Sequence, residues 1–176
     1  GNVSEYSKEF YIDKKPYSAM LKIVGLGFYS SKINGKLTDK FYYKPLLTDF
    51  EVRKGLNNEL YDEEKNGKGR KSIIYDLFNV TDKIKLGKNE LNVLVGTGWY
   101  NNVAKDCVDP SYNYGNPKLY FELTLNYADG ETLIVSDKTT LVRNTAHQSN
   151  LFGSDKKDFT AKKEDFIACE EVADTS

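Results

Sequence analysis

The chain has 176 residues, which suits one compact domain and is too short for a large catalytic barrel. Hydrophobic residues make up 39% of it, so a buried core can form. The 25 basic and 26 acidic residues leave a net charge of −1, which provides no field to attract nucleic acid or an anionic membrane surface. We therefore expect no nucleic acid partner and no membrane partner.

Few side chains are available for covalent or metal chemistry. The two cysteines, Cys107 and Cys169, are too few for a disulfide scaffold and lack the paired spacing of a zinc site. His147 is the only histidine, which excludes a multi-histidine metal centre and leaves one candidate base for a Ser-His-Asp arrangement. Acidic residues are numerous, but no motif singles out the facing pair of a glycosidase. We expect that the chain is not an enzyme on its own.

The first strand signals come early in the chain. Residues 19–24 alternate with period two, and a second run covers residues 28–33 after the connection Gly25-Leu26-Gly27. The pair Asn34-Gly35 then predicts a tight turn, because both residue types accept positive φ angles. Residues 1–17 are expected to be a lead-in strand or linker.

The middle of the chain begins with a polar segment. Residues 56–71 have mixed charge and two glycines, which predicts a long solvated loop. Strand candidates follow at residues 72–80 and 89–95, with turn signals at Thr81-Asp82 and Leu86-Gly87 between them.

The clearest alternation lies in residues 119–127, where apolar side chains occupy the odd positions. Ala128-Asp129-Gly130 predicts a hairpin turn into residues 132–135. Only residues 160–172 are a candidate short helix. Short strands with glycine and asparagine turns predict an all-β, antiparallel β-sandwich or jelly roll over residues 18–160. Residues 161–176 are expected to be a C-terminal segment or a linker toward a next domain.

One segment combines the groups that sugar sites use. Residues 96–102, Gly-Thr-Gly-Trp-Tyr-Asn-Asn, carry aromatic faces that can stack on a ring and polar groups that can bond hydroxyls. The turn-rich loop at residues 106–117 adds further tyrosines. An equally open alternative is that the aromatic residues close the end of the sandwich. The candidate carbohydrate-binding residues are Trp99, Tyr100, Asn101, Tyr112 and Tyr114.

The same loop carries oxygen donors that suit calcium, which takes carboxylate, amide and backbone oxygens. These are Asp106, Asp109, Asn113 and Asn116, and Asp49 is a further possible ligand. Their spacing matches no EF-hand loop, and a solvated loop without metal explains the same residues.

Several segments, taken in order, resemble the N-terminal β-sandwich domain of bacterial α-L-rhamnosidases of glycoside hydrolase family 78. The resemblance covers residues 18 to about 160 and implies a galactose-binding-domain-like sandwich. The segments are Gly27-Phe28-Tyr29, Ile33-Asn34-Gly35-Lys36, Tyr75 to Thr81, Leu86 to Asn89, Gly96 to Tyr100, Tyr127 to Gly130, Ser136-Asp137 and Leu151-Phe152-Gly153.

The resemblance also implies a role and a place. In this family the domain precedes an (α/α) toroid that carries the catalytic acids, so the chain would be a non-catalytic accessory domain of a multidomain α-L-rhamnosidase. Its partners would be a rhamnose-containing glycan and the catalytic domain of the same polypeptide. Its location would be periplasmic or extracellular in a bacterium. A purely structural domain that packs on the toroid, without a sugar site, is the alternative.

The family further implies a ligand set. Some of these sandwiches bind terminal L-rhamnose through calcium, beside the Gly-Trp-Tyr motif. The corresponding residues here are Asp49, Asn113, Asn116 and Pro117. This chain departs from the family after Ser136-Asp137 and after Gly153, where Thr139 or Thr140 replaces a tryptophan and Ser154 replaces a glutamate.

Overall fold

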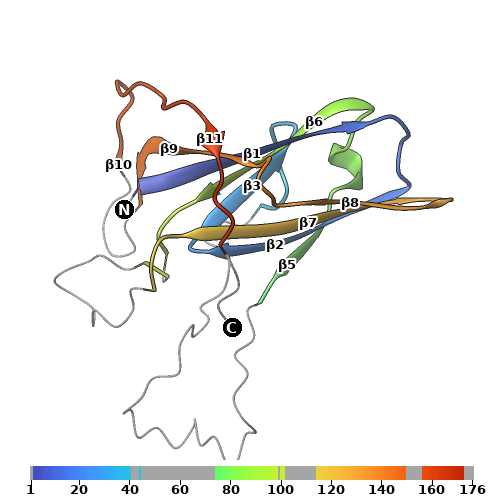
Figure 1. Ribbon diagram of the computed structural model, residues 1–176, viewed down its shortest axis with the longest axis horizontal. Coiled ribbons are helices and arrows are strands. Elements are labelled where there is room, and N and C mark those ends of the chain that lie inside the picture. Colours follow the sequence, from blue (N-terminus) through green and yellow to red (C-terminus); the bar gives the residue numbers. More distant parts are fainter. Residues whose placement is uncertain are drawn as a thin grey trace, which may run out of the picture.

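The computed structural model shows two antiparallel β-sheets stacked face to face (Figure 1). No α-helix occurs among the residues that it describes, and one short 3-10 turn, η2 (Thr81–Lys83), connects two strands. The predicted all-β antiparallel sandwich is therefore confirmed. The described residues are 2–40, 44, 74–98, 100–101, 114–149 and 156–172.

The larger sheet contains seven of the described strands. In spatial order they are β10 (Lys156–Lys157), β9 (Leu141–Gln148), β1 (Asn2–Ile12), β6 (Gly87–Val95), β3 (Tyr29–Ile33) and β4 (Lys36–Leu37), and β11 (Ile167–Ala168) also pairs with β9. The smaller sheet has the order β5 (Asp76–Asn79), β2 (Ser18–Leu26), β7 (Lys118–Tyr127) and β8 (Gly130–Val135). The paired strands are antiparallel in both sheets.

The core lies between the sheets and is built by the period-two alternation. In β2 the side chains of Ala19, Leu21 and Ile23 are fully buried, and in β7 Leu123 and Leu125 are as well. The residues between them face outward, so one face of each strand packs in the core and the other faces solvent. From the larger sheet, the buried core residues are Ile12, Tyr29, Ile33, Leu91, Val93 and Val95.

The predicted turns are confirmed. Asn34 and Gly35 have φ angles of 51° and 79°, as a type I′ hairpin requires, and Ile33 pairs with Lys36. The side-chain nitrogen of Asn34, Nδ2, also donates to Oδ1 of Asn89 at 2.8 Å, and Asn89 is buried. The turn is thereby fixed to the start of β6. The 128–129 turn likewise brings Tyr127 opposite Gly130.

Two expectations differ from the structure. Residues 1–17 were expected as a lead-in strand or linker ahead of the sandwich. Asn2–Ile12 is a strand, but it lies inside the larger sheet, between β9 and β6. The sequence pattern does not show that this strand belongs to the sandwich, because Lys8 interrupts the inward-facing apolar positions. A helix at residues 160–172 is wrong, because Ile167 and Ala168 instead extend the sheet by pairing with β9. A short isolated helix is marginal, and an unpaired strand edge offers its backbone better partners.

The inward-facing lysine has a specific partner. Nζ of Lys8 donates to Oδ1 of Asp137 at 2.6 Å and to the Thr139 hydroxyl, and the Lys8 side chain is only 8% exposed. Asp137 follows β8, so the ion pair ties the larger sheet to the segment that leaves the smaller one.

We expect this ion pair to make the fold acid-sensitive. The bond from Lys8 is the main cause that lowers the pKa of Asp137 from 3.8 to about 2. Because the folded-state pKa is the lower one, the pair stabilises the fold above about pH 4 and loses that contribution as the pH falls toward about 2. Urea unfolding at a series of pH values, with Asp137→Asn as the control, measures this. Equal acid dependence in both proteins would contradict the expectation.

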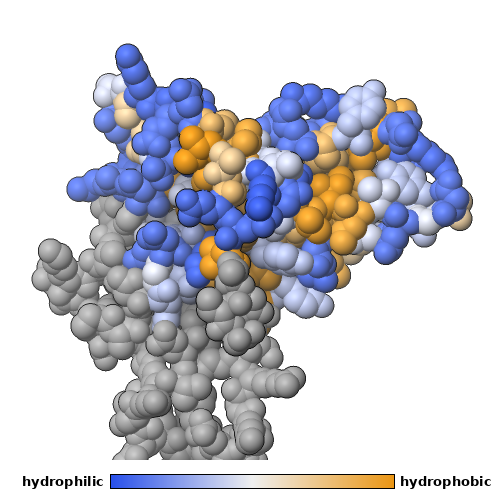
Figure 2. Space-filling model, in the orientation of Figure 1, coloured by the Kyte–Doolittle hydropathy of each residue, from blue (hydrophilic) through white to orange (hydrophobic). Residues whose placement is uncertain are grey.

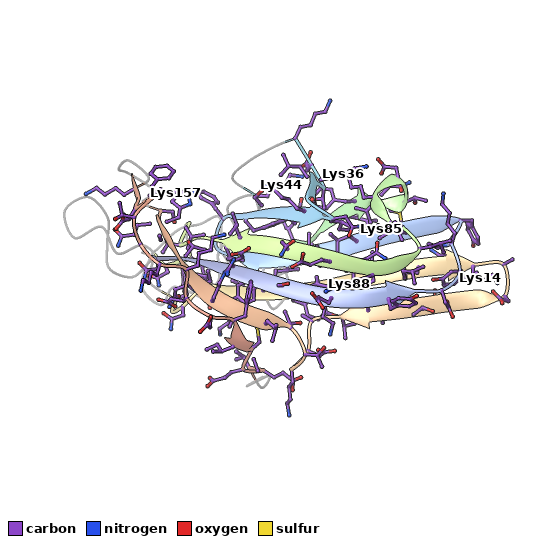
Figure 3. The ribbon with its side chains drawn as sticks, turned by 90° about the horizontal axis from the view of Figure 1, so that it is seen from above. Lys14, Lys36, Lys44, Lys85, Lys88 and Lys157 are labelled. Atoms are coloured by element: carbon purple, nitrogen blue, oxygen red, sulfur yellow. The ribbon has the colours of Figure 1, made fainter. Side chains whose placement is uncertain are left out.

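Figure 3 shows the labelled lysines on several sides of the molecule: Lys14 and Lys157 lie at opposite ends, and Lys36 and Lys44 lie along one side. Within the described residues, no helix is long and apolar enough to cross a membrane.

Candidate functional site

At one end of the sandwich the connection after β2 crosses the segment that leaves β6. The backbone N–H of Gly96 donates to the carbonyl of Phe28 at 2.7 Å. A Cβ on Gly27 would stand 2.1 Å from the Gly96 carbonyl oxygen, and one on Gly98 would stand 2.6 Å from the Phe28 nitrogen. Glycines are therefore required here for the close approach of two backbones. They fix where residues 96–102 leave the sheet.

The end of β9 joins the same crossing. The Thr97 N–H donates to the Ser149 hydroxyl at 3.2 Å, and Thr97 is buried. A Cβ on Gly96 would lie 2.5 Å from that hydroxyl oxygen. The segments that follow β2, β6 and β9 are thus anchored to one another, and the candidate loop begins on a rigid base.

Three predicted site residues lie together beyond this base. The rings of Tyr100 and Tyr114 have centroids 5.8 Å apart, and the Tyr114 N–H donates to the Tyr100 carbonyl at 3.0 Å. The Asn101 N–H donates to the Thr97 carbonyl at 3.1 Å. The two described ends of the connection between β6 and β7 therefore meet here. Tyr100 is only 6% exposed, so its ring also closes this end of the sandwich.

Asn101 has an unusual side-chain oxygen. Its Oδ1 is buried, and within the described residues it accepts no hydrogen bond. Most buried amide oxygens in folded proteins are bonded, and one left without a partner costs about 1–3 kcal/mol. Such an oxygen can accept a bond from a ligand hydroxyl or coordinate a hard cation.

The predicted metal ligands are described in part. Asn116 is exposed, and the Cβ of Pro117 packs 3.3 Å from where a Cβ on Gly27 would stand. The Asn116 amide and the Pro117 backbone supply neutral carbonyl oxygens, which are donors that calcium accepts, so these two residues fit the ion. Among the described residues, no group of three or more His, Cys, Asp or Glu side chains could hold a metal. The remaining candidates lie outside the described residues: Asp49, Trp99, Asp106, Asp109, Tyr112 and Asn113.

A second polar cluster, which the sequence did not indicate, lies where β3 approaches β5. The Tyr29 hydroxyl donates to Asp76, and Nζ of Lys44 lies 2.6 Å from Oδ2 of Asp39 and 3.5 Å from Oδ1 of Asp76. Burial and the bond to Asp76 raise the pKa of Tyr29. Each of these groups is bonded to another member, so we interpret the cluster as a bridge between the two sheets. The sequence pattern did not predict this cluster because Tyr29 and Asp76 are far apart in the chain.

These features define a two-sheet β-sandwich domain with a glycine-anchored loop site at one end. Residues 63–174 match the family described as the α-L-rhamnosidase N-terminal domain. The chain belongs to this family. α-L-Rhamnosidases are glycoside hydrolases, and this domain is not their catalytic one.

Two curated relatives of the chain are named α-L-rhamnosidase. The chain is 24% identical to an α-L-rhamnosidase of Formosa agariphila over 77% of its own length, and 29% identical to one of Streptomyces avermitilis over 66%. It spans only 13% and 9% of those two proteins.

Solved structures show the same fold. The S. avermitilis α-L-rhamnosidase, solved with L-rhamnose, superimposes with a TM-score of 0.71 at 24% identity, over 89% of this chain and 14% of that one. The α-L-rhamnosidase of Dictyoglomus thermophilum gives 0.69 at 24% identity, over 96% of this chain and 18% of that one. At these identities the comparison supports the fold alone.

Proposed function

We propose that the chain is the carbohydrate-binding accessory domain of a larger α-L-rhamnosidase. The loops at the glycine-anchored end would bind terminal L-rhamnose or a rhamnose-containing glycan. The observation that carries the proposal is the buried Oδ1 of Asn101, which has no partner among the described residues where Tyr100 and Tyr114 bring the two ends of the β6–β7 connection together. A sugar hydroxyl is a suitable donor for this oxygen.

The candidate residues would have different roles in the proposed site. Trp99 and Tyr114 would stack on the sugar ring, with Tyr112 beside them, while the buried Tyr100 holds Tyr114 in place. Calcium would supply a positive charge for vicinal sugar hydroxyls. Its ligands would be Asp49, Asn113, Asn116 and Pro117.

The reaction itself belongs to the rest of the polypeptide. Because the chain spans a small part of its relatives, hydrolysis of rhamnosides would be carried out by a catalytic domain on the same polypeptide. We place that enzyme in the periplasm or outside a bacterial cell, where glycan substrates are met.

A calorimetric titration with L-rhamnose tests the site directly. We expect saturable heat with calcium and none with chelator, because the metal bridges the sugar. Trp99→Ala should weaken binding by about 1–3 kcal/mol, the usual contribution of one stacking aromatic at a binding hot spot. Tyr11→Ala is the matched control, since Tyr11 is 75% exposed near the far end of β1.

A structural domain without a sugar site is the second candidate. The burial of Tyr100 against Tyr114 and the half-exposed Leu77 on the outer face of the smaller sheet favour it. No heat in either condition would contradict the sugar site and support a role in packing on the catalytic domain. Circular dichroism in chelator separates loss of binding from loss of the fold.

A further inference from the structure

Strand β8 is an unprotected edge of the smaller sheet. All six of its residues pair with β7, and in the described structure β8 is the last strand on that side. The other edge strands that the structure describes are shorter: β4, β10 and β11 have two residues each and β5 has four. A long edge strand is a template for pairing with another strand.

The hydrogen-bonding pattern shows which groups of β8 face outward. The Ser136 N–H donates to the Phe121 carbonyl at 3.1 Å, so these two residues form a hydrogen-bonded pair with β7. Because such pairs alternate in an antiparallel ladder, Gly130, Thr132 and Ile134 also bond to β7. The N–H and C=O groups of the residues between them point away from the sheet. Those residues are Glu131, Leu133 and Val135.

The side chains of β8 give this edge little protection. Natural edge strands usually carry charged residues, above all lysine, or proline or a bulge, whereas β8 reads Gly-Glu-Thr-Leu-Ile-Val, has Glu131 as its one charged residue and keeps a regular register with β7. Leu133, at its centre, is 54% exposed. Figure 2 shows apolar surface gathered over this region. In Figure 1, the β7–β8 hairpin extends away from β10 and β11, which lie over the other half of the molecule.

We propose that β8 pairs with β8 of a second copy of this chain, antiparallel, about a two-fold axis at Leu133. This register pairs Glu131 with Val135 of the second copy and Leu133 with Leu133 of the second copy. It uses the N–H and C=O groups of all three outward-facing residues, whereas a shift by two residues in either direction leaves one of the three without its partner. The two exposed leucines bury each other. The smaller sheets of the two copies become one continuous sheet.

Charge does not oppose this arrangement. The two Glu131 side chains lie four residues apart along the strands, about 13 Å, which exceeds the screening length of about 8–10 Å at moderate salt. Because six-residue edge pairing buries less surface than a standard interface, the dimer is weak and reversible.

Sedimentation velocity over a concentration series tests the proposal. The wild-type chain should shift reversibly from monomer to dimer as concentration rises. Leu133→Lys should raise the dissociation constant by at least about tenfold, since it places two lysines side by side on the axis. Leu77→Lys is the matched control, because Leu77 is also 54% exposed and lies on β5, at the opposite edge of the same sheet. It should leave the dimer unchanged.

Amide exchange in the same samples identifies the surface. In a dimer, the amides of Glu131, Leu133 and Val135 should become protected as concentration rises, while the β7-bonded amides stay protected throughout. A wild-type chain that stays monomeric at every concentration overturns the proposal. Equal weakening by Leu77→Lys and Leu133→Lys also overturns it, because the contact would then use the outer face of the sheet rather than its edge.

Discussion

Gly27→Ala should destabilise the domain by about 3–5 kcal/mol, because two separate costs fall on one residue. Gly27 has a φ of +126°, which side-chain-bearing residues rarely adopt, and its added Cβ would stand 2.1 Å from the Gly96 carbonyl oxygen. That oxygen belongs to the backbone and cannot rotate away. Relief would require the segment after β2 to separate from the segment after β6. Urea unfolding followed by circular dichroism measures the loss.

Gly130→Ala separates the two costs. Gly130 also has a positive φ, +144°, but nothing lies within 4 Å of where its Cβ would stand. Its replacement should therefore cost only the backbone strain, about 1–3 kcal/mol. A difference of at least about 1 kcal/mol between the two variants is expected from the close approach at Gly27. Equal losses would show that the crossing of the two segments relaxes freely.

Gly27→Ala should also disturb the candidate site. Residues 97–101 begin at this crossing, so a shift of Gly96 moves Tyr100 and Asn101 with it. In a folded fraction of Gly27→Ala, we expect rhamnose binding to be weaker, although no contact with the sugar is removed.

Local patterns predicted the elements that depend on neighbours in sequence. Residues 119–127 alternate cleanly and form β7, and Asn34-Gly35 forms its turn because both residues tolerate positive φ. Alternation did not show which face of β8 is buried, since both faces carry aliphatic residues. The register with β7 decides this: Ile134 lies opposite the buried Leu123, so Leu133 points outward.

The place of β1 inside the larger sheet depends on a distant partner and was missed for a physical reason. β1 carries Lys8 on its inward face, and only Asp137, far along the chain, makes that burial tolerable. Most of the segments that carry the family resemblance also have structural partners: Asn34 bonds Asn89, Gly27 contacts Gly96, and Asp137 bonds Lys8. The resemblance therefore predicted the fold well. It said less about ligand contacts, which depend on loop residues with weak patterns.

The candidate site was predictable in outline. The sequence placed Tyr100, Asn101 and Tyr114 in one region, and the structure brings these three together. The unpartnered Asn101 oxygen could not be foreseen, because hydrogen-bond satisfaction depends on how the two ends of the β6–β7 connection pack together. The binding roles of all the candidate residues, Trp99 and Asp49 among them, stay predictions.

Asp137→Ala should destabilise the fold by about 2–3 kcal/mol, whereas Lys8→Met should stay within about 1 kcal/mol of the wild type. The asymmetry arises because removal of the carboxylate leaves a buried ammonium group with only the Thr139 hydroxyl, while methionine fills the same space without a charge. The Asp137 figure is set below the usual cost of breaking a buried pair, since the Asp137 side chain is 39% exposed and water can partly replace it.

The double variant decides whether the pair explains both effects. Once Lys8 is methionine, Asp137→Ala should cost only the two remaining bonds that its carboxylate accepts from the Thr139 N–H and hydroxyl, so the double variant should unfold close to Lys8→Met alone. Chemical unfolding of the four proteins gives the coupling energy between the two residues. A coupling near zero would mean that the lysine reaches water when its partner is removed. β1 would then be held in the sheet by its backbone pairing and by Tyr6, Phe10 and Ile12.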